Sequence, residues 1–370
     1  MSAKRQHRLF VFCGFMAILL CGAFSKPVSA EPAFAIRTGY ACSTCHVNRT
    51  GGGLRTSFGS IYAQTVLPRR LLRFRQENNL LAANPDARFN IGGDFRGQYL
   101  AVASDDGANV SSFEVPEANF YTQVRLIPGK LSLYVDETLG PSGASSREFF
   151  GLYEFAKGDG YVKVGKFLPP FGWRLPDDAA LIRQFTGFAY SNPDTGVEVG
   201  FEPGKWSIHL AVTNGAGGGG DDNRSKQVSL LTVRRIGKGR IGLSASNNLP
   251  QGARVVQAGI LGGFHSGRLS LLAEADWRET RAGTGESRRL IGYFEADVLI
   301  SRGFTLKLSH DWLDPDLDID TDAQTRTSIG IELIPFPFLQ LRYFVRFRDG
   351  PPQTLGARDN SVEIEAHFFF

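Results

Sequence analysis

The chain has 370 residues, with 41 Lys and Arg against 37 Asp and Glu. The first thirty residues carry four of these bases and no acid, so 41 minus 4 leaves 37 bases against 37 acids in the rest. A chain balanced in this way offers no electrostatic argument for a nucleic-acid partner. Beyond residue 30 the chain keeps two of its four cysteines and no methionine.

Residues 1–30 have the pattern of a secretory signal peptide. A basic start is followed by an apolar run over residues 9–24, and residues 28–30, Val-Ser-Ala, fit a signal-peptidase site. We therefore expect cleavage before Glu31. Cys21 is not expected to carry a lipid anchor, because Leu20 stands where a small residue is required. No later run of eighteen apolar residues occurs, so the sequence predicts no transmembrane helix after the signal.

From residue 86 onward, short segments alternate apolar and polar residues. In residues 206–213 the apolar side chains Trp206, Ile208, Leu210 and Val212 alternate with Ser207, His209, Ala211 and Thr213. Side chains of a strand point alternately to its two faces, so such a segment has one apolar face and one polar face. Short turns such as KGDG and EPGK alternate with long connections such as NGAGGGGDDNRSK, which is typical of outer-membrane barrels.

The C-terminal residues VEIEAHFFF continue the alternation and end on Phe370, which resembles the assembly signal of Gram-negative outer-membrane proteins. The sequence thus predicts an all-β protein, a transmembrane antiparallel outer-membrane β-barrel of about sixteen strands over residues 86–370. Closure removes the unpaired strand edges that lipid does not tolerate. The alternative is a soluble all-β domain, which would need its apolar faces to meet in a core.

Residues 31–85 precede the barrel and are expected to be mostly helical. A sixteen-stranded barrel leaves an aqueous lumen unless something fills it, so this segment is a candidate plug. The longest connection, residues 169–195, resembles the long third loop of many porins, which folds into the pore. It could equally pack on the plug.

The candidate plug contains Cys42-Ser43-Thr44-Cys45-His46, which is the attachment signature of a c-type haem. In that interpretation the two sulfurs form thioethers to the haem vinyl groups, and His46 supplies the proximal nitrogen to the iron. The signal peptide directs the chain to the compartment where such haem is attached. The alternative is a disulfide or a chance pair of cysteines, and no other cysteine follows residue 30 to pair with these two.

The second axial position of the iron has several candidates. Methionine is excluded, because none follows residue 30. His209 and His367 lie on polar faces near predicted periplasmic ends, so either could reach a haem in the lumen. His310 shares the parity of an apolar face and is expected to face lipid, and His265 is expected in a short turn. Water, a lysine or an open site are the other choices, since strand parity does not identify an axial ligand.

The predicted external loop DPDLDIDTD carries five carboxylates, Asp314, Asp316, Asp318, Asp320 and Asp322, at every second position. In an extended chain all five would lie on one side, where Ca²⁺ or Fe²⁺ would be attracted. A solvated acidic loop is the simpler interpretation. No Ser-His-Asp group, phosphate loop or zinc spacing indicates a hydrolase or a nucleotide enzyme.

These features resemble the fused monohaem cytochrome–porin family of outer-membrane electron-transfer proteins, of the iron-oxidase type. The local resemblance is carried by PAFAIRTGYACSTCH and by SFGSIY, with Phe58 and Gly59. Between them the chain has VNRTGGGLRTSFG where the family has an aromatic–proline pair. This departure counts against iron as the substrate more than it counts against electron transfer.

The resemblance implies one covalent haem c on Cys42, Cys45 and His46, and an oxidoreductase activity of the Fe(II):cytochrome c type. It also implies outer-membrane lipid, a periplasmic c-type cytochrome and an extracellular donor or acceptor such as iron as partners. The expected location is the outer membrane of a Gram-negative bacterium.

Two other functions are compatible with the sequence. One is a solute porin with an accessory haem segment, and the arginines of RYFVRFR suit an anion channel. The other is a barrel that sheaths a separate multihaem cytochrome. The position of residues 31–85 discriminates between these functions. If these residues lie inside the lumen, they favour an electron conduit. If they hang outside an open pore, they favour a porin. The sheath needs an empty lumen.

Overall fold

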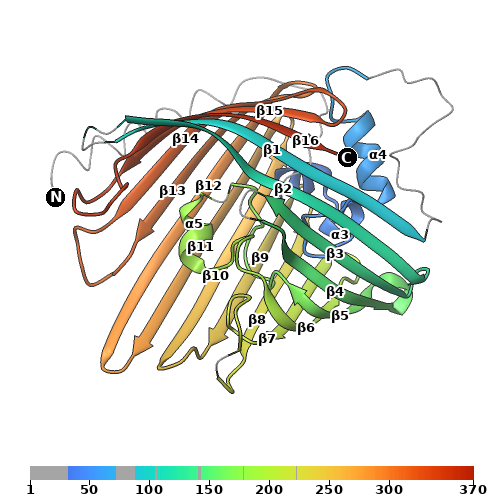
Figure 1. The fold of residues 1–370 in the computed structure, drawn as a ribbon, viewed down its shortest axis with the longest axis horizontal. Helices are drawn as coiled ribbons and strands as arrows, with labels where there is room; N and C mark the ends of the chain where they lie inside the picture. The colour runs from blue at the N-terminus through green and yellow to red at the C-terminus, as the bar shows by residue number, and fades with distance from the viewer. Residues whose placement is uncertain are drawn as a thin grey trace.

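The computed structural model describes residues 32–71, 88–104, 107, 109–140, 143–177, 179–221 and 223–370. The predicted signal peptide, residues 1–30, lies outside the described residues. The chain forms a closed barrel of sixteen antiparallel strands, and a small helical segment comes before it in the sequence (Figure 1). The predicted fold class and the predicted number of strands are confirmed.

Each strand pairs with its neighbours in sequence, and β1 pairs with β16 to close the barrel. The strands are β1 (Phe89–Ala103), β2 (Asn109–Ile127), β3 (Leu131–Gly140), β4 (Ser145–Phe155), β5 (Gly160–Phe167), β6 (Asp194–Phe201), β7 (Trp206–Thr213), β8 (Gln227–Ile236), β9 (Gly239–Asn248), β10 (Ala253–Ser266), β11 (Leu269–Ala282), β12 (Gly285–Ser301), β13 (Phe304–Asp314), β14 (Gln324–Phe336), β15 (Leu339–Asp349) and β16 (Asn360–Phe369).

The described helices are short. They are α2 (Pro32–Thr38), α3 (Cys42–Cys45), α4 (Ser57–Thr65) and α5 (Leu181–Thr186), with the 3₁₀ turn η1 (Ala156–Gly158). No helix within the described residues has the length and apolar character needed to cross a membrane.

Short turns join the strands at one end of the barrel, as predicted. The other end carries the long connections, residues 168–193, 214–226, 315–323 and 350–359, but also four connections of five residues or fewer. Two local expectations are wrong. The segment ETRAGTGES, which the sequence pattern predicts as another long connection, is not a loop, because β11 and β12 run on to a two-residue turn at residues 283–284. Its charges pair along this hairpin, where Arg281 contacts Glu279 at 2.8 Å and Glu286 at 3.3 Å. His265 lies within β10, opposite Ser270, and not in a turn.

The period-two alternation of the sequence separates an apolar outer face from a polar inner face. Leu210 and Leu243 are 46% and 56% exposed, whereas His209 and Ser244, their neighbours in sequence, are buried. Exposed apolar side chains recur at alternate positions around the barrel. Such a band is what an outer-membrane barrel presents to lipid.

The lumen is filled by two pieces of chain. The long connection between β5 and β6, residues 168–193, folds inward and carries α5, which contacts β11, β12 and β13 (Figure 1). Its Leu181 and Ile182 pack with Ile36 of α2 in one apolar cluster. This cluster also includes wall residues that face inward, Leu231, Leu261, Leu272, Ile291 and Leu313. Residues 32–71 therefore lie inside the barrel as a plug, at the end with the short turns and the C-terminus.

We predict that Leu243→Arg destabilises the membrane-inserted barrel by about 2–4 kcal/mol, which is the cost of a charged side chain on the lipid face near the bilayer midplane. Leu243 lies near the middle of β9, so lipid surrounds the new charge. Urea-dependent unfolding in lipid vesicles measures the effect, and Leu243→Ala controls for the lost side chain. Equal stability of the two variants would contradict the assignment of this face to lipid.

Candidate functional site

Two short helices pack directly on one another around the cysteine pair. Thr56 caps α4, because its hydroxyl accepts a hydrogen bond from the Gly59 backbone N–H at 3.1 Å. A Cβ atom on Gly59 would come within 2.2 Å of the Cys45 carbonyl oxygen. Glycine at this position therefore allows α4 to lie against the end of α3. This packing gives a physical reason for Gly59 in SFGSIY.

The chain after the motif forms a small hairpin. His46 and Arg55 face each other across an antiparallel bridge, and the Val47 N–H donates to the Leu54 carbonyl at 3.0 Å. Gly51, Gly52 and Gly53 turn the chain, all with positive φ, a region that glycine enters without steric cost.

Neighbouring side chains also crowd the second and third glycines, the third much more closely. A Cβ on Gly52 would lie 3.0 Å from the Tyr190 hydroxyl, and one on Gly53 would lie 2.1 Å from the Tyr134 hydroxyl. Tyr190 belongs to the long inward connection and Tyr134 to β3. The sequence GGG thus lets this hairpin fit between the loop and the wall.

Polar side chains fasten the plug to the wall. The Asn48 amide nitrogen donates to both oxygens of Glu148, at 2.9 and 2.8 Å, and its oxygen accepts from the Lys163 ammonium at 3.1 Å. Lys163 also pairs with Glu198 at 2.9 Å, and neither side chain is exposed. Arg49 pairs with Glu154 and, at 3.2 Å, with Glu202. The motif is held beside β4, β5 and β6.

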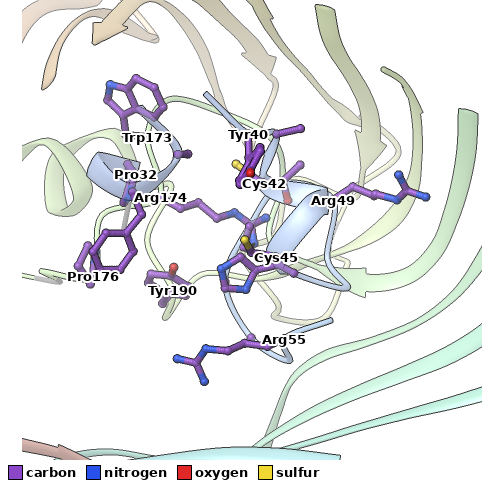
Figure 2. A pocket seen from close by; sticks show the side chains of 18 of the residues that line it. Pro32, Tyr40, Cys42, Cys45, Arg49, Arg55, Trp173, Arg174, Pro176 and Tyr190 are labelled. Carbon is purple, nitrogen blue, oxygen red and sulfur yellow. Dashed lines mark hydrogen bonds between the residues drawn. The ribbon is translucent and has the colours of Figure 1, made fainter. Parts of the chain in front are cut away.

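Cys42, Cys45 and His46 all line one cavity between the plug, the long inward connection and the wall, which we call the motif chamber. Its free volume is about 200 Å³. Pockets for drug-sized ligands usually measure about 300–1,000 Å³, so a larger ligand would need side chains of the chamber to move apart. Figure 2 shows both cysteine sulfurs in this chamber, with Arg174 of the long connection extending toward Cys45.

Burial determines the protonation of the motif. Burial raises the pKa of the Cys42 thiol. Burial is also the main cause that raises the pKa of the Cys45 thiol to about 11, and the nearby Cys42 adds to it. Burial is the main cause that lowers the pKa of the His46 imidazole to about 4, and the positive charge of Arg55 is the next. At neutral pH His46 is therefore an uncharged imidazole, the form that binds metal ions. The two cysteines are free thiols.

The structure brings both candidate distal histidines into the motif chamber. His209 is buried, and its Nδ1 lies 2.7 Å from the Tyr161 hydroxyl. His367 has both ring nitrogens engaged, Nδ1 with Gln340 at 2.8 Å and Nε2 with Asp94. A histidine with two occupied nitrogens must give up a partner before it can bind iron. His209 is therefore the better placed of the two.

The other two histidines lie elsewhere. His265 contacts the Ser270 hydroxyl through Nδ1 at 3.3 Å. His310 lies on the outer face of β13, with the parity predicted for it, and its Nδ1 lies 2.9 Å from the Thr327 hydroxyl. Neither lines the motif chamber.

The five aspartates of the external loop do not form a cation site. Residues 315–322 turn repeatedly and do not form the extended chain on which that expectation rested. Asp318 instead pairs with Arg288 at 2.8 Å. Across the described residues, no three or more His, Cys, Asp or Glu side chains come together in a way that could hold a metal ion.

A second cavity of about 390 Å³ lies farther along the lumen. Its lining shares Arg96, Glu117, Pro176 and Arg342 with the motif chamber. Arg96 pairs with Glu117 at 3.1 Å and donates to the Pro176 carbonyl at 3.4 Å. These contacts separate the two cavities.

No family model matches the chain, and no curated protein matches it. Solved barrels do match. A loop L8 deletion mutant of OmpT, an outer-membrane protein of Vibrio cholerae, is 12% identical with a TM-score of 0.61, over 76% of this chain and 99% of that one. An anion-selective porin from Comamonas acidovorans is 11% identical with a TM-score of 0.61, over 76% and 99%. The outer-membrane channel DcaP of Acinetobacter baumannii is 11% identical with a TM-score of 0.57, over 76% and 97%.

At these identities the likeness shows the fold alone. The chain has the fold of outer-membrane porins. Together with its lipid-facing apolar band, this fold places the protein in an outer membrane.

We predict that Lys163→Met destabilises the plugged barrel by about 3–5 kcal/mol, because Glu198 stays buried without its cation. The loosened plug raises ion conductance in planar bilayers. The double variant Lys163→Met/Glu198→Leu is the matched control, since removing both charges avoids the unpaired carboxylate. A single variant as stable and as poorly conducting as the unmodified protein would contradict this role.

Asp177 anchors the long inward connection and gives a pH prediction. Burial alone would raise its pKa, but Arg326 at 2.9 Å and Arg346 at 3.5 Å hold the pKa well below the usual 3.8. Because the folded-state pKa is the lower one, the stabilisation is complete above about pH 3.8 and is lost as the pH falls through the lowered pKa.

We expect low conductance from pH 7 to 4 and a rise at more acid pH as the connection is released. Asp177→Asn weakens the anchor by about 1.5–3 kcal/mol, the range for hydrogen bonds to charged groups, and raises conductance already at pH 7. Planar-bilayer recordings at stepped pH measure both effects. An acid response unchanged by the substitution would assign it to another group.

Proposed function

We propose that this protein is an outer-membrane electron conduit in which one haem c, covalently attached at Cys42 and Cys45 and bound by His46, passes single electrons between an extracellular partner and a periplasmic c-type cytochrome. The observation that carries this proposal is the position of the motif. It lies inside the lumen, where both cysteines and His46 line one chamber, and not on a segment outside an open pore.

The residues of the chamber fit such a group. Both cysteines are free thiols, and His46 is neutral at physiological pH. The Nδ1 atom of His46 is buried and has no hydrogen-bond partner among the described residues. The Gly53 backbone lies close to the ring. When bound, a haem c supplies one-electron chemistry at its iron.

The chain's own residues would orient and insulate the redox group. The hairpin from His46 to Arg55 fixes the imidazole, and Asn48 fixes that hairpin to the wall. The inward connection covers the chamber from the other side through Arg174, whose guanidinium donates to the Gly51 carbonyl at 2.9 Å. In this proposal His209 is the distal ligand and His367 the less favoured alternative.

The plug lies at the end of the barrel with the short turns, which in outer-membrane barrels is the periplasmic end. A periplasmic cytochrome would therefore approach the side nearest the motif. An external partner such as Fe²⁺, which would be the substrate and not a resident metal, would reach the chamber past Arg96, Glu117 and Pro176.

A second candidate is an anion-selective solute channel, and the comparisons favour it. The solved barrels that match are porins and channels, one of them named anion-selective. The second cavity is lined in part by Arg342, Arg346 and Arg348, as RYFVRFR suggested. The sheath for a separate multihaem cytochrome is disfavoured, because residues 32–71 and 168–193 occupy the lumen.

We predict that the mature protein, made in cells that attach c-type haem, shows a c-type absorption spectrum and stains for covalent haem on a denaturing gel. Cys42→Ala/Cys45→Ala loses the stain to background, while His265→Ala keeps it. If His209 is the distal ligand, His209→Ala shifts the haem to high spin and His367→Ala does not. Anaerobic addition of Fe²⁺ then tests whether iron is a donor.

Conductance separates the two functions. The conduit predicts covalent haem with low conductance, whereas the channel predicts a chloride-selective conductance that is the same with and without haem. Absence of covalent haem from the unmodified protein would overturn the conduit.

A further inference from the structure

The motif chamber carries an excess of positive charge. Its lining contains eight arginines, Arg49, Arg55, Arg96, Arg147, Arg174, Arg235, Arg240 and Arg342, but only three carboxylates, Asp94, Glu117 and Glu202. Cations gathered in a partly buried cavity repel one another, because charges interact more strongly there than in water. Such a lining is complementary to an anionic ligand.

Half of these arginines already have carboxylate partners. Arg49, Arg96, Arg147 and Arg342 form ion pairs with acids of the wall. The other four form no ion pair with a carboxylate among the described residues. Three of those donate to backbone carbonyls: Arg174 to Gly51 and Leu168, Arg235 to Gly204, and Arg240 to Ala35 and Tyr40.

Arg55 is the fourth, and its donors meet no acceptor in the part of the chain that the structure describes. Its Nε is buried without a partner, and its guanidinium carbon lies 4.6 Å from the centre of the Phe369 ring. The nearby carboxylate of Asp94 already has hydrogen-bond partners in Tyr121 and His367. Figure 2 shows the Arg55 guanidinium below Cys45, pointing away from it.

The backbone fixes this arginine relative to the iron ligand. Arg55 lies directly opposite His46 in the antiparallel bridge, and the neighbouring Thr56 N–H donates to the Cys45 carbonyl at 3.0 Å. A group tied to Cys45 and bound by His46 therefore has Arg55 beside it. An arginine fork is suited to a carboxylate, which it can bind through two parallel N–H bonds.

We propose that Arg55 binds a propionate carboxylate of the haem and positions the group in the chamber. This inference rests on the proposed function, because it needs the haem on Cys42 and Cys45. The two haem carboxylates then offset two of the four positive charges that lack an acid. Arg55 acts on orientation and on redox potential, since a cation near the iron favours the reduced state, which carries one positive charge fewer.

The test compares Arg55→Gln, Arg55→Lys and the control Arg254→Gln in the full, haem-loaded protein. Arg254 is exposed, bonds to Asn247 and does not line the chamber. Three properties are measured: covalent haem by stain, the midpoint potential by spectroelectrochemical titration, and the haem propionate bending band by resonance Raman. Heat-dependent migration on gels verifies that each barrel has folded.

We expect Arg55→Gln to keep covalent haem, to lower the midpoint potential by the equivalent of up to a tenfold change in the one-electron equilibrium, about 59 mV, and to shift the propionate band. Arg55→Lys keeps most of the potential, because the charge remains, but still shifts the band, because the fork is lost. Arg254→Gln matches the unmodified protein in all three.

A propionate band unchanged in Arg55→Gln, with haem attached, overturns the inference and leaves the conduit standing. If Arg55→Gln does not fold, the band of Arg55→Lys decides, and an unchanged band again overturns the inference. Absence of covalent haem from the unmodified protein overturns the proposed function, and this inference with it.

Discussion

The buried amide of Asn48 is the contact on which the position of the motif depends. The lumen wall is polar, so a segment inside it must satisfy every buried donor and acceptor that it covers. Asn48 offers an acceptor to Lys163 and donors to Glu148 through one short side chain. Because Asn48 follows His46 by two residues, this contact holds the backbone of the motif close to the wall. The glycines that follow are then required, since no larger residue fits between the wall and the inward connection.

The barrel could be predicted because its signal is local and repeated. Alternation such as His209 inward and Leu210 outward specifies a strand with one face to lipid, and sixteen such segments specify closure. What fills the lumen could not be predicted in this way. Leu272 and Ile291 face inward although they are apolar, because they pack against the inward connection and α2. Strand parity gives the direction of a side chain but not the partner it meets.

The same distinction between local and long-range signals applies to the residues of the candidate site. Cys42, Cys45 and His46 are recognisable because haem attachment requires fixed spacing within five residues. Arg174 comes from a distant loop, and only the fold brings it to Gly51, so no sequence signal marks it. Arg55 lies nine residues after His46, and its place depends on a hairpin that the three glycines permit. His367 was a fair candidate by parity, yet its ring nitrogens are taken up by Gln340 and Asp94.

The likeness to porins and the haem motif concern different parts of the chain. Residues from Phe89 to Phe369, 281 of 370, make up 76% of the chain, the same share that the solved barrels match over nearly their whole length. A shared wall does not determine what passes through it, because transport depends on what occupies the lumen. Here the plug adds Arg55, and the inward connection adds Arg174, both without acids. Both guanidinium groups line the motif chamber, so the porin-like wall and the positive charge inside it come from different parts of the chain.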